Sequence, residues 1–290
     1  MSVPQSVGVR RSMPWSSSDV ERIVPGTPEW DRHYSEHIQR YEFVARQLVP
    51  GMRVLDAGCG CGYGAAFLND RGADSVVAVD LSAEALGIGR TQFHRPGITW
   101  VQEDCEVLEV AGHGARFDLV CNLENFEHLP DPERFLARVV ELMLPQGVFV
   151  TSTPNRIGLN RLRAVRSDVA PLNPFHFREF TAEEFRTVLA KHFGDVTLAY
   201  QTYAPIERLE WEPLLTTLWN NPAARLGRWL QRAARRRPVV ERVEELLLAP
   251  RYQILETFPG DDLVLVQLAL CRAPRRADAL PAPPVERHRR

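Results

Sequence analysis

A glycine-rich turn contains the residues that are best suited, by type and spacing, to hold a ligand. The apolar run Val54–Ala57 leads into Gly-Cys-Gly-Cys-Gly-Tyr-Gly at 58–64, and a helix start follows. Such a strand-to-helix turn binds polar ligands, because backbone N–H groups point outward and glycine permits close approach. The dinucleotide fingerprint G-x-G-x-x-G, counted from Gly58, needs a glycine where this chain has Tyr63. Asp56 would repel a pyrophosphate, so the turn favours a ligand with a cationic amine over a nicotinamide cofactor.

Acidic residues follow the next two predicted strands. Asp80 closes the strand 75–79, where a carboxylate can accept hydrogen bonds from both hydroxyls of a ribose. Its alternative role is the N-cap of the next helix, and the glycine turn before it favours ribose binding. Asp104 and Cys105 follow the strand 98–102, and an aspartate at a strand end can also cap a turn.

A second group of polar residues follows the fourth predicted strand. If Glu124 begins a helical turn, Glu127 and His128 share a face with it. Histidine can take a proton from a hydroxyl near neutral pH, which makes His128 the first candidate catalytic base and His176, in a later connection, the second. An alternative is a metal site for Mg²⁺ or another hard cation, which would lower the pKa of a substrate hydroxyl. Its ligands would be Glu124, Glu127 and His128. A purely structural role is the third interpretation.

The segment Tyr34–Leu48 has apolar residues at helical spacing and precedes the glycine turn. A helix there can cover the ligand and offer Arg40 to a carboxylate, with Tyr41 beside it. It can equally be a packing helix whose arginine is solvated, and the pattern leaves both interpretations open.

Alternating strands and helices predict an α/β fold. Strands are expected at 53–57, 75–79, 98–102, 117–123, 148–152, 196–203 and 263–270. Helices are expected at about 62–70, from 82 onward, at 132–144 and at 181–192. The fourth strand is a nearly continuous apolar run, which suits a sheet covered on both faces.

The composition limits the class of protein. The chain has 290 residues and a formal net charge of −2, which argues against a general nucleic-acid binder. Its 5 cysteines form no C-x-x-C pair, which favours reduced thiols in a cytoplasmic protein over disulfides or a zinc site. The N-terminus has no apolar signal region, and no run approaches ~18 apolar residues, so neither secretion nor a membrane span is expected.

The glycine turn and the acids at their intervals resemble motif I and the following motifs of class I S-adenosylmethionine (SAM)-dependent methyltransferases. The resemblance implies a Rossmann-like, seven-stranded, mostly parallel sheet with helices on both faces. It implies that Asp56, Gly58 and Gly60 hold the methionine part of SAM, that Asp80 holds the ribose, and that Asp104 and Cys105 hold the adenine. The full set of cofactor residues that it implies is Arg40, Tyr41, Asp56, Gly58, Cys59, Gly60, Asp80, Leu81, Asp104, Cys105 and Asn122.

Further similarities indicate which kind of molecule accepts the methyl group. The segments 21–25, 37–41, 152–156 and 173–180 are similar to methyltransferases of cell-surface glycan and secondary-metabolite pathways. Glu-x-x-Glu-His at 124–128 resembles quinone-biosynthesis O-methyltransferases, where it can carry a divalent metal. These similarities imply methyl transfer to a hydroxyl of a sugar or natural product. The alternatives are N-methylation of an amino sugar and a non-catalytic SAM-binding interaction protein.

Five parts are expected along the chain. They are a disordered N-terminus at 1–20, an N-terminal helical cap at 21–50, a SAM-binding domain at 51–203 and 259–272, a helical insertion at 204–258, and a disordered tail at 273–290. The insertion is expected to be a substrate lid or an interaction element. Its arginine-rich stretch 225–237 can dock on an anionic membrane or receive a phosphorylated substrate, or it can be a solvated helix face.

Overall fold

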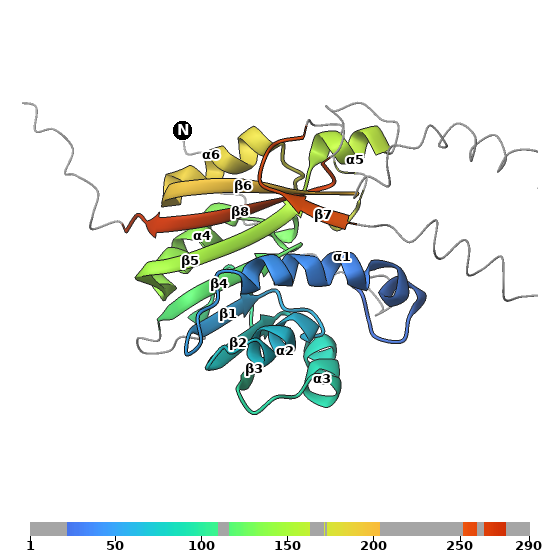
Figure 1. Ribbon diagram of the computed structural model, residues 1–290, viewed down its shortest axis with the longest axis vertical. Helices are drawn as coiled ribbons and strands as arrows, with labels where there is room; N and C mark the ends of the chain where they lie inside the picture. The colour runs from blue at the N-terminus through green and yellow to red at the C-terminus, as the bar shows by residue number, and fades with distance from the viewer. Residues whose placement is uncertain are drawn as a thin grey trace, which may run out of the picture.

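A single twisted sheet organises the structure, a computed structural model that describes residues 22–109, 116–162, 171, 173–203, 252–259 and 264–276 (Figure 1). Its strands are β1 (Arg53–Ala57), β2 (Ser75–Asp80), β3 (Ile98–Gln102), β4 (Phe117–Leu123), β5 (Met143–Pro154), β6 (Phe193–Tyr203), β7 (Tyr252–Leu255) and β8 (Val266–Pro274). The helices are α1 (Pro28–Ala45), α2 (Tyr63–Asp70), α3 (Ala83–Gln92), the 3₁₀ turn η3 (Phe126–His128), α4 (Pro132–Leu142), α5 (Arg156–Leu162) and α6 (Ala182–His192).

The strand order is β3-β2-β1-β4-β5-β8-β6-β7 in an 8-stranded sheet. β1 to β5 pair in parallel, and β8 enters antiparallel between β5 and β6. The predicted α/β class with a mostly parallel core is therefore confirmed. The strand count differs from seven because β7 pairs antiparallel with β6, within the segment that we expected to be helical.

The helices cover both faces of the sheet. One core cluster joins the sheet to residues of α1, α2 and α3, among them Val44, Leu68 and Leu86. The other joins it to α4 and α6 through residues such as Phe135 and Phe185. Figure 1 shows the same division, with α1 to α3 on the near side and α4 and α6 behind. Apolar side chains thus occupy both faces of the strands, as the continuous apolar run in β4 indicated.

Several element boundaries differ from those expected. α1 begins earlier than Tyr34, because the Thr27 hydroxyl accepts a hydrogen bond from the Trp30 N–H and a proline occupies the first turn. α6 begins as expected, with a capping box between Thr181 and Glu184. The long connection after β5 contains an additional helix, α5.

Two glycines of the turn make room for aromatic rings. A Cβ on Gly62 would lie 2.2 Å from the Trp100 ring, and one on Gly64 would lie 1.8 Å from the Tyr41 ring. Neither position can therefore carry a side chain unless the Trp100 or the Tyr41 ring moves. Gly58 and Gly60 have φ of 81° and 56°, in the left-handed region that favours glycine.

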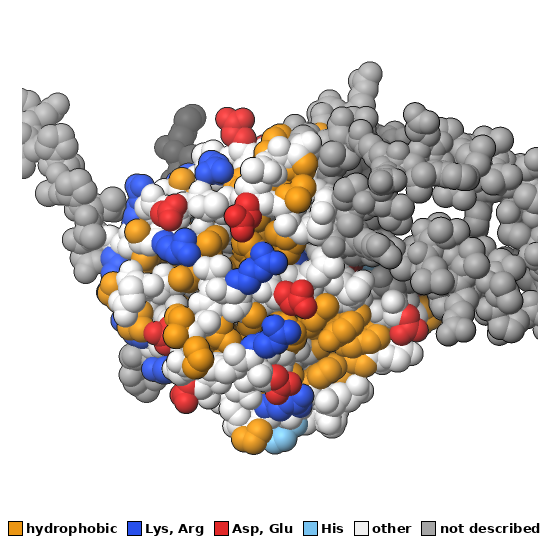
Figure 2. Space-filling view, viewed as in Figure 1, with side chains coloured by type: hydrophobic (Ala, Val, Ile, Leu, Met, Phe, Trp, Pro, Cys, Tyr) orange, Lys and Arg blue, Asp and Glu red, His pale blue; other side chains and the backbone are white. Residues whose placement is uncertain are grey.

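Some expectations concern residues outside the described part of the chain. These are the N-terminus at 1–20, the segment 204–251 with its arginine-rich stretch 225–237, and the tail beyond 276. Among the described residues, no helix combines the length and apolar character needed to cross a bilayer. On the face drawn in Figure 2, basic and acidic side chains are interspersed over the described surface.

Candidate active site

A cavity of about 290 Å³ opens at the carboxyl ends of β1, β2 and β4. This edge is where open α/β sheets bind ligands, and the volume is near the lower end of the ~300–1,000 Å³ typical of small-molecule sites. Six of the predicted cofactor residues line it: Tyr41, Gly58, Cys59, Gly60, Asp80 and Leu81. The others, which do not line it, are Arg40, Asp56, Asp104, Cys105 and Asn122.

Asp80 is the acidic centre of one end of the cavity. Its Oδ2 accepts a hydrogen bond from the Gly60 N–H at 2.8 Å, and its Oδ1 accepts one from the Ser82 N–H at 2.8 Å. The Arg22 guanidinium also reaches Oδ1 at 3.3 Å. The N-cap of α3 is Ser82, whose hydroxyl accepts from Ala85, so the capping alternative for Asp80 is wrong. Asp80 therefore holds the glycine turn and lines the cavity, and its contact with a ribose stays a prediction.

Asp56 differs from the expectation that it faces the ligand. Its carboxylate is fully buried and accepts hydrogen bonds from the Tyr41 hydroxyl, at 3.2 and 3.3 Å, and from the Cys121 thiol at 3.4 Å. Burial raises the pKa of Asp56 to about 7. The physical reason is α1, which brings Tyr41 against Gly64 and places its hydroxyl on the carboxylate. Asp56 therefore joins β1 to α1 and to β4.

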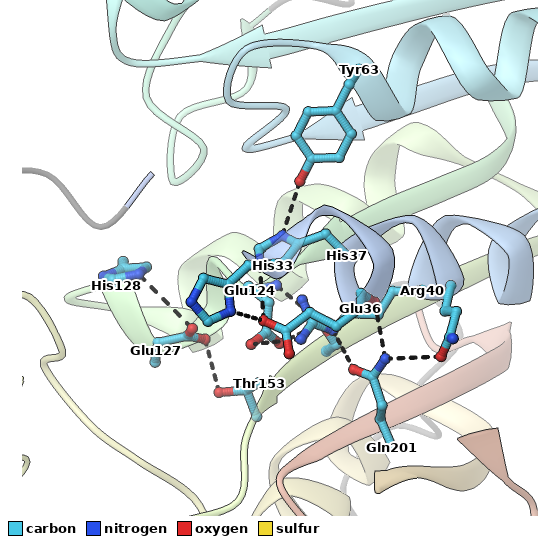
Figure 3. Close-up of polar contacts among 12 residues, drawn as sticks. His33, Glu36, His37, Arg40, Tyr63, Glu124, Glu127, His128, Thr153 and Gln201 are labelled. Atoms are coloured by element: carbon cyan, nitrogen blue, oxygen red, sulfur yellow. Dashed lines mark hydrogen bonds and ion pairs between the residues drawn. The ribbon is translucent and has the colours of Figure 1, made fainter. Parts of the chain in front are cut away.

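Arg40 is buried, 3% exposed, so the interpretation as a solvated arginine is wrong. Its Nε donates to Gln201 at 2.7 Å, and its Nη2 lies 3.8 Å from Glu124 Oε2 (Figure 3). Its Nη1 is buried without a hydrogen-bond partner. Glu124 lines the cavity, accepts from the Ser152 hydroxyl at 2.8 Å and has a left-handed φ of 49°. A buried cation and a pocket-lining anion thus lie side by side.

Three further predicted cofactor residues, Asp104 and Cys105 for adenine and Asn122, make contacts with other parts of the protein. The Asp104 carboxylate accepts from the Glu106 N–H at 2.9 Å, which is the turn-capping role. Cys105 is buried, and burial raises the pKa of its thiol. Asn122 donates to the Ala57 carbonyl at 2.8 Å and joins β4 to β1. None of the three lines the cavity, so their contact with a cofactor stays a prediction.

The other end of the cavity carries His128, on the turn η3. A carbonyl can only accept, so the contact of His128 Nδ1 with the Phe175 carbonyl at 3.0 Å makes Nδ1 the donor. Neutral His128 therefore has its lone pair on Nε2, which lies 3.9 Å from Glu127 Oε1. Glu127 is buried and accepts a hydrogen bond from the Thr153 hydroxyl at 2.9 Å. Burial raises the pKa of Glu127 to about 8, and the nearby Glu124 carboxylate adds to this effect. Figure 3 shows the contacts of Glu127 with His128 and with Thr153.

His176 lies behind His128 and does not line the cavity. The two rings meet edge to face with centroids 5.0 Å apart. His176 Nδ1 lies 2.9 Å from Glu179 Oε1, and Nε2 lies 2.9 Å from the Asn173 amide. With both nitrogens engaged away from the cavity, His176 is poorly placed to act as the base.

The predicted metal set is not brought together as expected. In the part of the chain that the structure describes, the atoms that cluster within 4.8 Å of one another belong to Glu127, His128 and His176. Glu124 instead faces Arg40 and Ser152. This cluster does not fit Mg²⁺, because that cation prefers oxygen ligands and the lone pair of His176 faces an amide donor.

Sequence reasoning did not assign two pocket residues that join α1 to the glycine turn. His37 Nδ1 hydrogen-bonds the Tyr63 hydroxyl at 2.9 Å, and enclosure, with Arg40 and His33 nearby, holds the pKa of His37 well below its usual value. The Tyr63 ring contacts Trp30, Tyr34, Tyr41 and Phe93. The sequence did contain a signal for Tyr63, because this residue occupies the position where the dinucleotide fingerprint requires glycine. Arg22, Ile23, Cys61, Leu123, Asn125 and Phe175 also line the cavity.

Comparison with known proteins agrees with this arrangement. A family described as a methyltransferase domain matches residues 30–194. The chain belongs to this methyltransferase family. The resemblance stated from the sequence is therefore confirmed at the level of the family.

Two relatives and one solved structure illustrate the similarity. A protein of Mycolicibacterium smegmatis, named a probable S-adenosylmethionine-dependent methyltransferase, is 34% identical over 169 residues, 58% of this chain and 62% of the relative. A ubiquinone biosynthesis O-methyltransferase of Cereibacter sphaeroides is 37% identical over 106 residues, 37% of this chain and 42% of the relative. The chain thus spans less than two thirds of either relative. The crystal structure of a SAM-dependent methyltransferase of Thermotoga maritima has a TM-score of 0.52 and 14% identity, covering 84% of this chain and 92% of that one, and shows the shared fold.

Proposed function

We propose that this protein is a SAM-dependent O-methyltransferase that acts on a hydroxyl of a sugar or natural-product small molecule. One observation carries the proposal: a single cavity joins the glycine turn and Asp80 at one end to His128 at the other. The first end suits a nucleoside, and the second supplies a base. The family match and the names of the two relatives support both the cofactor and the reaction class.

The residues present fit the cofactor. SAM has a ribose with two hydroxyls, a cationic sulfonium and a zwitterionic amino acid group. Asp80 can accept from the hydroxyls once Arg22 moves off its carboxylate. Glu124, which lines the cavity, can offer a carboxylate to the ammonium of the amino acid group, and Arg40, with its unpartnered Nη1, is buried beside it. The glycine turn leaves open space at Gly60, where a Cβ would meet nothing nearer than Arg22 Nε at 3.9 Å.

His128 has the chemistry that a hydroxyl acceptor needs. When bound, SAM supplies an electrophilic methyl group, and the pocket holds the acceptor in line with it. The Nε2 lone pair of His128 takes the hydroxyl proton, while Nδ1 remains hydrogen-bonded to the Phe175 carbonyl. The resulting imidazolium lies beside the Glu127 carboxyl group, with Nε2 3.9 Å from Oε1.

The competing functions differ in the group that accepts the methyl and in whether a catalytic base is needed. A neutral amine of an amino sugar needs no strong base, so N-methylation predicts that His128→Ala retains turnover. A non-catalytic SAM-binding protein predicts binding without transfer to any component of an extract. The direct test is to incubate the protein with methyl-labelled SAM and with glycan and metabolite extracts, with and without a chelator, and to identify the labelled product. Label in no product contradicts the proposed activity, and a loss of label on chelation contradicts the metal-free base.

We infer that the protein acts in the cytoplasm on a small molecule or glycan, without nucleic acid. The support for the compartment is that all five cysteines are buried free thiols.

A further inference from the structure

The connection 173–180 is fastened to the turn that carries His128. The Phe177 N–H donates to the Glu127 carbonyl at 2.8 Å. The Phe175 carbonyl accepts from His128 Nδ1 at 3.0 Å, although these two residues are 47 positions apart. The hydrogen bond that sets the tautomer of His128 therefore depends on the conformation of a distant segment.

Within this connection, His176 and Glu179 form a buried pair. Their side chains are 3% and 1% exposed, and His176 Nδ1 lies 2.9 Å from Glu179 Oε1. The Asn173 amide fixes the tautomer of His176. Its oxygen accepts from the Phe175 N–H at 3.0 Å, so its NH₂ group faces His176 Nε2 at 2.9 Å. Because an NH₂ group donates, Nε2 accepts, and the ring proton of neutral His176 is on Nδ1 and is donated to Glu179.

The pair borders His128 in two ways. The ring of His176 meets the ring of His128 edge to face, at 76° and 5.0 Å between centroids. His176 also follows Phe175 directly in the chain, so its anchoring to Asn173 and Glu179 fixes where the Phe175 carbonyl lies. Releasing His176 would move the carbonyl and the neighbouring ring together.

We propose that His176 and Glu179 are positioning residues, which hold the Phe175 carbonyl against His128 Nδ1 and so keep the lone pair of His128 on Nε2. This inference rests on the proposed function, in which that lone pair takes the proton of the acceptor. Without the pair, His128 populates the tautomer with its proton on Nε2, which cannot accept a proton there. A pair that served only the stability of the fold would leave the tautomer unchanged.

The test measures the tautomer directly by nitrogen NMR of the full chain labelled with ¹⁵N-histidine, at a pH where the imidazoles are neutral. His128→Gln and His176→Gln assign the two sets of signals. In the wild type, we expect His128 and His176 each to carry the proton on Nδ1. A wild-type His128 with its proton on Nε2 overturns the proposal, whatever any variant does.

The variants separate positioning from stability. Glu179→Leu removes the group that accepts the hydrogen bond of His176, and we expect a mixture of both tautomers at His128. The affinity for S-adenosylhomocysteine (SAH), measured by calorimetry, should stay within about twofold of the wild type. Glu183→Leu makes the same change at an exposed position in the first turn of α6 and should retain the wild-type pattern. Glu179→Gln keeps an acceptor oxygen and should also retain it.

A folded Glu179→Leu protein with the wild-type signals at His128 overturns the proposal. If that variant fails to fold, His176→Phe, which also removes the pair, is measured in its place, and a wild-type tautomer at His128 in that folded variant overturns the proposal. An absence of SAH binding by the wild type contradicts the methyltransferase function instead, so the two failures are distinguishable.

Discussion

The two ends of the pocket are built from different ranges of sequence. At the cofactor end, the Gly60 N–H meets Asp80 only 20 positions later, and both belong to one strand-helix-strand unit. At the acceptor end, His128 is oriented by a carbonyl 47 positions later, across α4, β5 and α5. The end with the glycine turn is therefore a local motif. The end with His128 depends on a long connection.

The largest effect that separates the two ends is expected for His128→Ala. It removes the base without touching the glycine turn, so methyl transfer to a hydroxyl should fall by about 10²–10⁴. SAH affinity, measured by calorimetry, should stay near that of the wild type. His94→Ala, at an exposed histidine, is the matched control. Unchanged turnover in His128→Ala would mean that the acceptor end supplies no base.

The complementary change at the cofactor end is Asp80→Asn. It removes the charge that accepts from Gly60 and Ser82, and we expect SAH binding to weaken by about 10–100-fold, from a loss of about 1.5–3 kcal/mol. Asp74→Asn, at an exposed position before the same strand, is the control for calorimetry. If Asp80→Asn binds SAH like the wild type, Asp80 does not hold the ribose.

Two buried acids outside the lining of the pocket have raised pKa values, Asp56 at about 7 and Glu127 at about 8. A raised folded-state pKa means that the folded state binds the proton more tightly than the unfolded state does. Each acid therefore adds stability at low pH, and this stability is lost as the pH rises from the unfolded value, about 4, through the folded value.

The melting temperature of the wild type should fall as the pH rises through this range. We expect the fall to be smaller in Asp56→Asn up to about pH 7, and smaller in Glu127→Gln up to about pH 8. Each variant serves as the control for the other in melting curves collected across this pH range. Curves parallel to the wild type for both variants would show that neither acid is protonated on burial.

The smallest effect is expected for Tyr63→Phe, which keeps the aromatic contacts of the ring and removes one hydrogen bond to His37. SAH binding should weaken by less than about tenfold, from a loss of about 0.5–1.5 kcal/mol. Tyr34→Phe removes a hydroxyl from a neighbouring ring of the same group and is the matched control. A loss of binding equal to that of Asp80→Asn would show that the hydroxyl of Tyr63 contacts the ligand.

The same contrast explains what the sequence could predict. The glycine turn and Asp80 were recognisable because their spacing is local and their roles follow from backbone geometry. The role of Asp56 was not recognisable, because only the packing of Tyr41 from α1 encloses its carboxylate and keeps it out of the cavity. The grouping of His176 with Glu127 and His128, in place of Glu124, depends on contacts between distant segments.

The central claim is that the glycine turn and Asp80 bind an adenosyl nucleoside. It is tested most directly by calorimetry of the full-length, folded protein with SAH, and with NADH as the comparison ligand. The account predicts saturable heat with one SAH per chain and none with NADH. No heat with SAH, or saturable binding of NADH in its place, would contradict it.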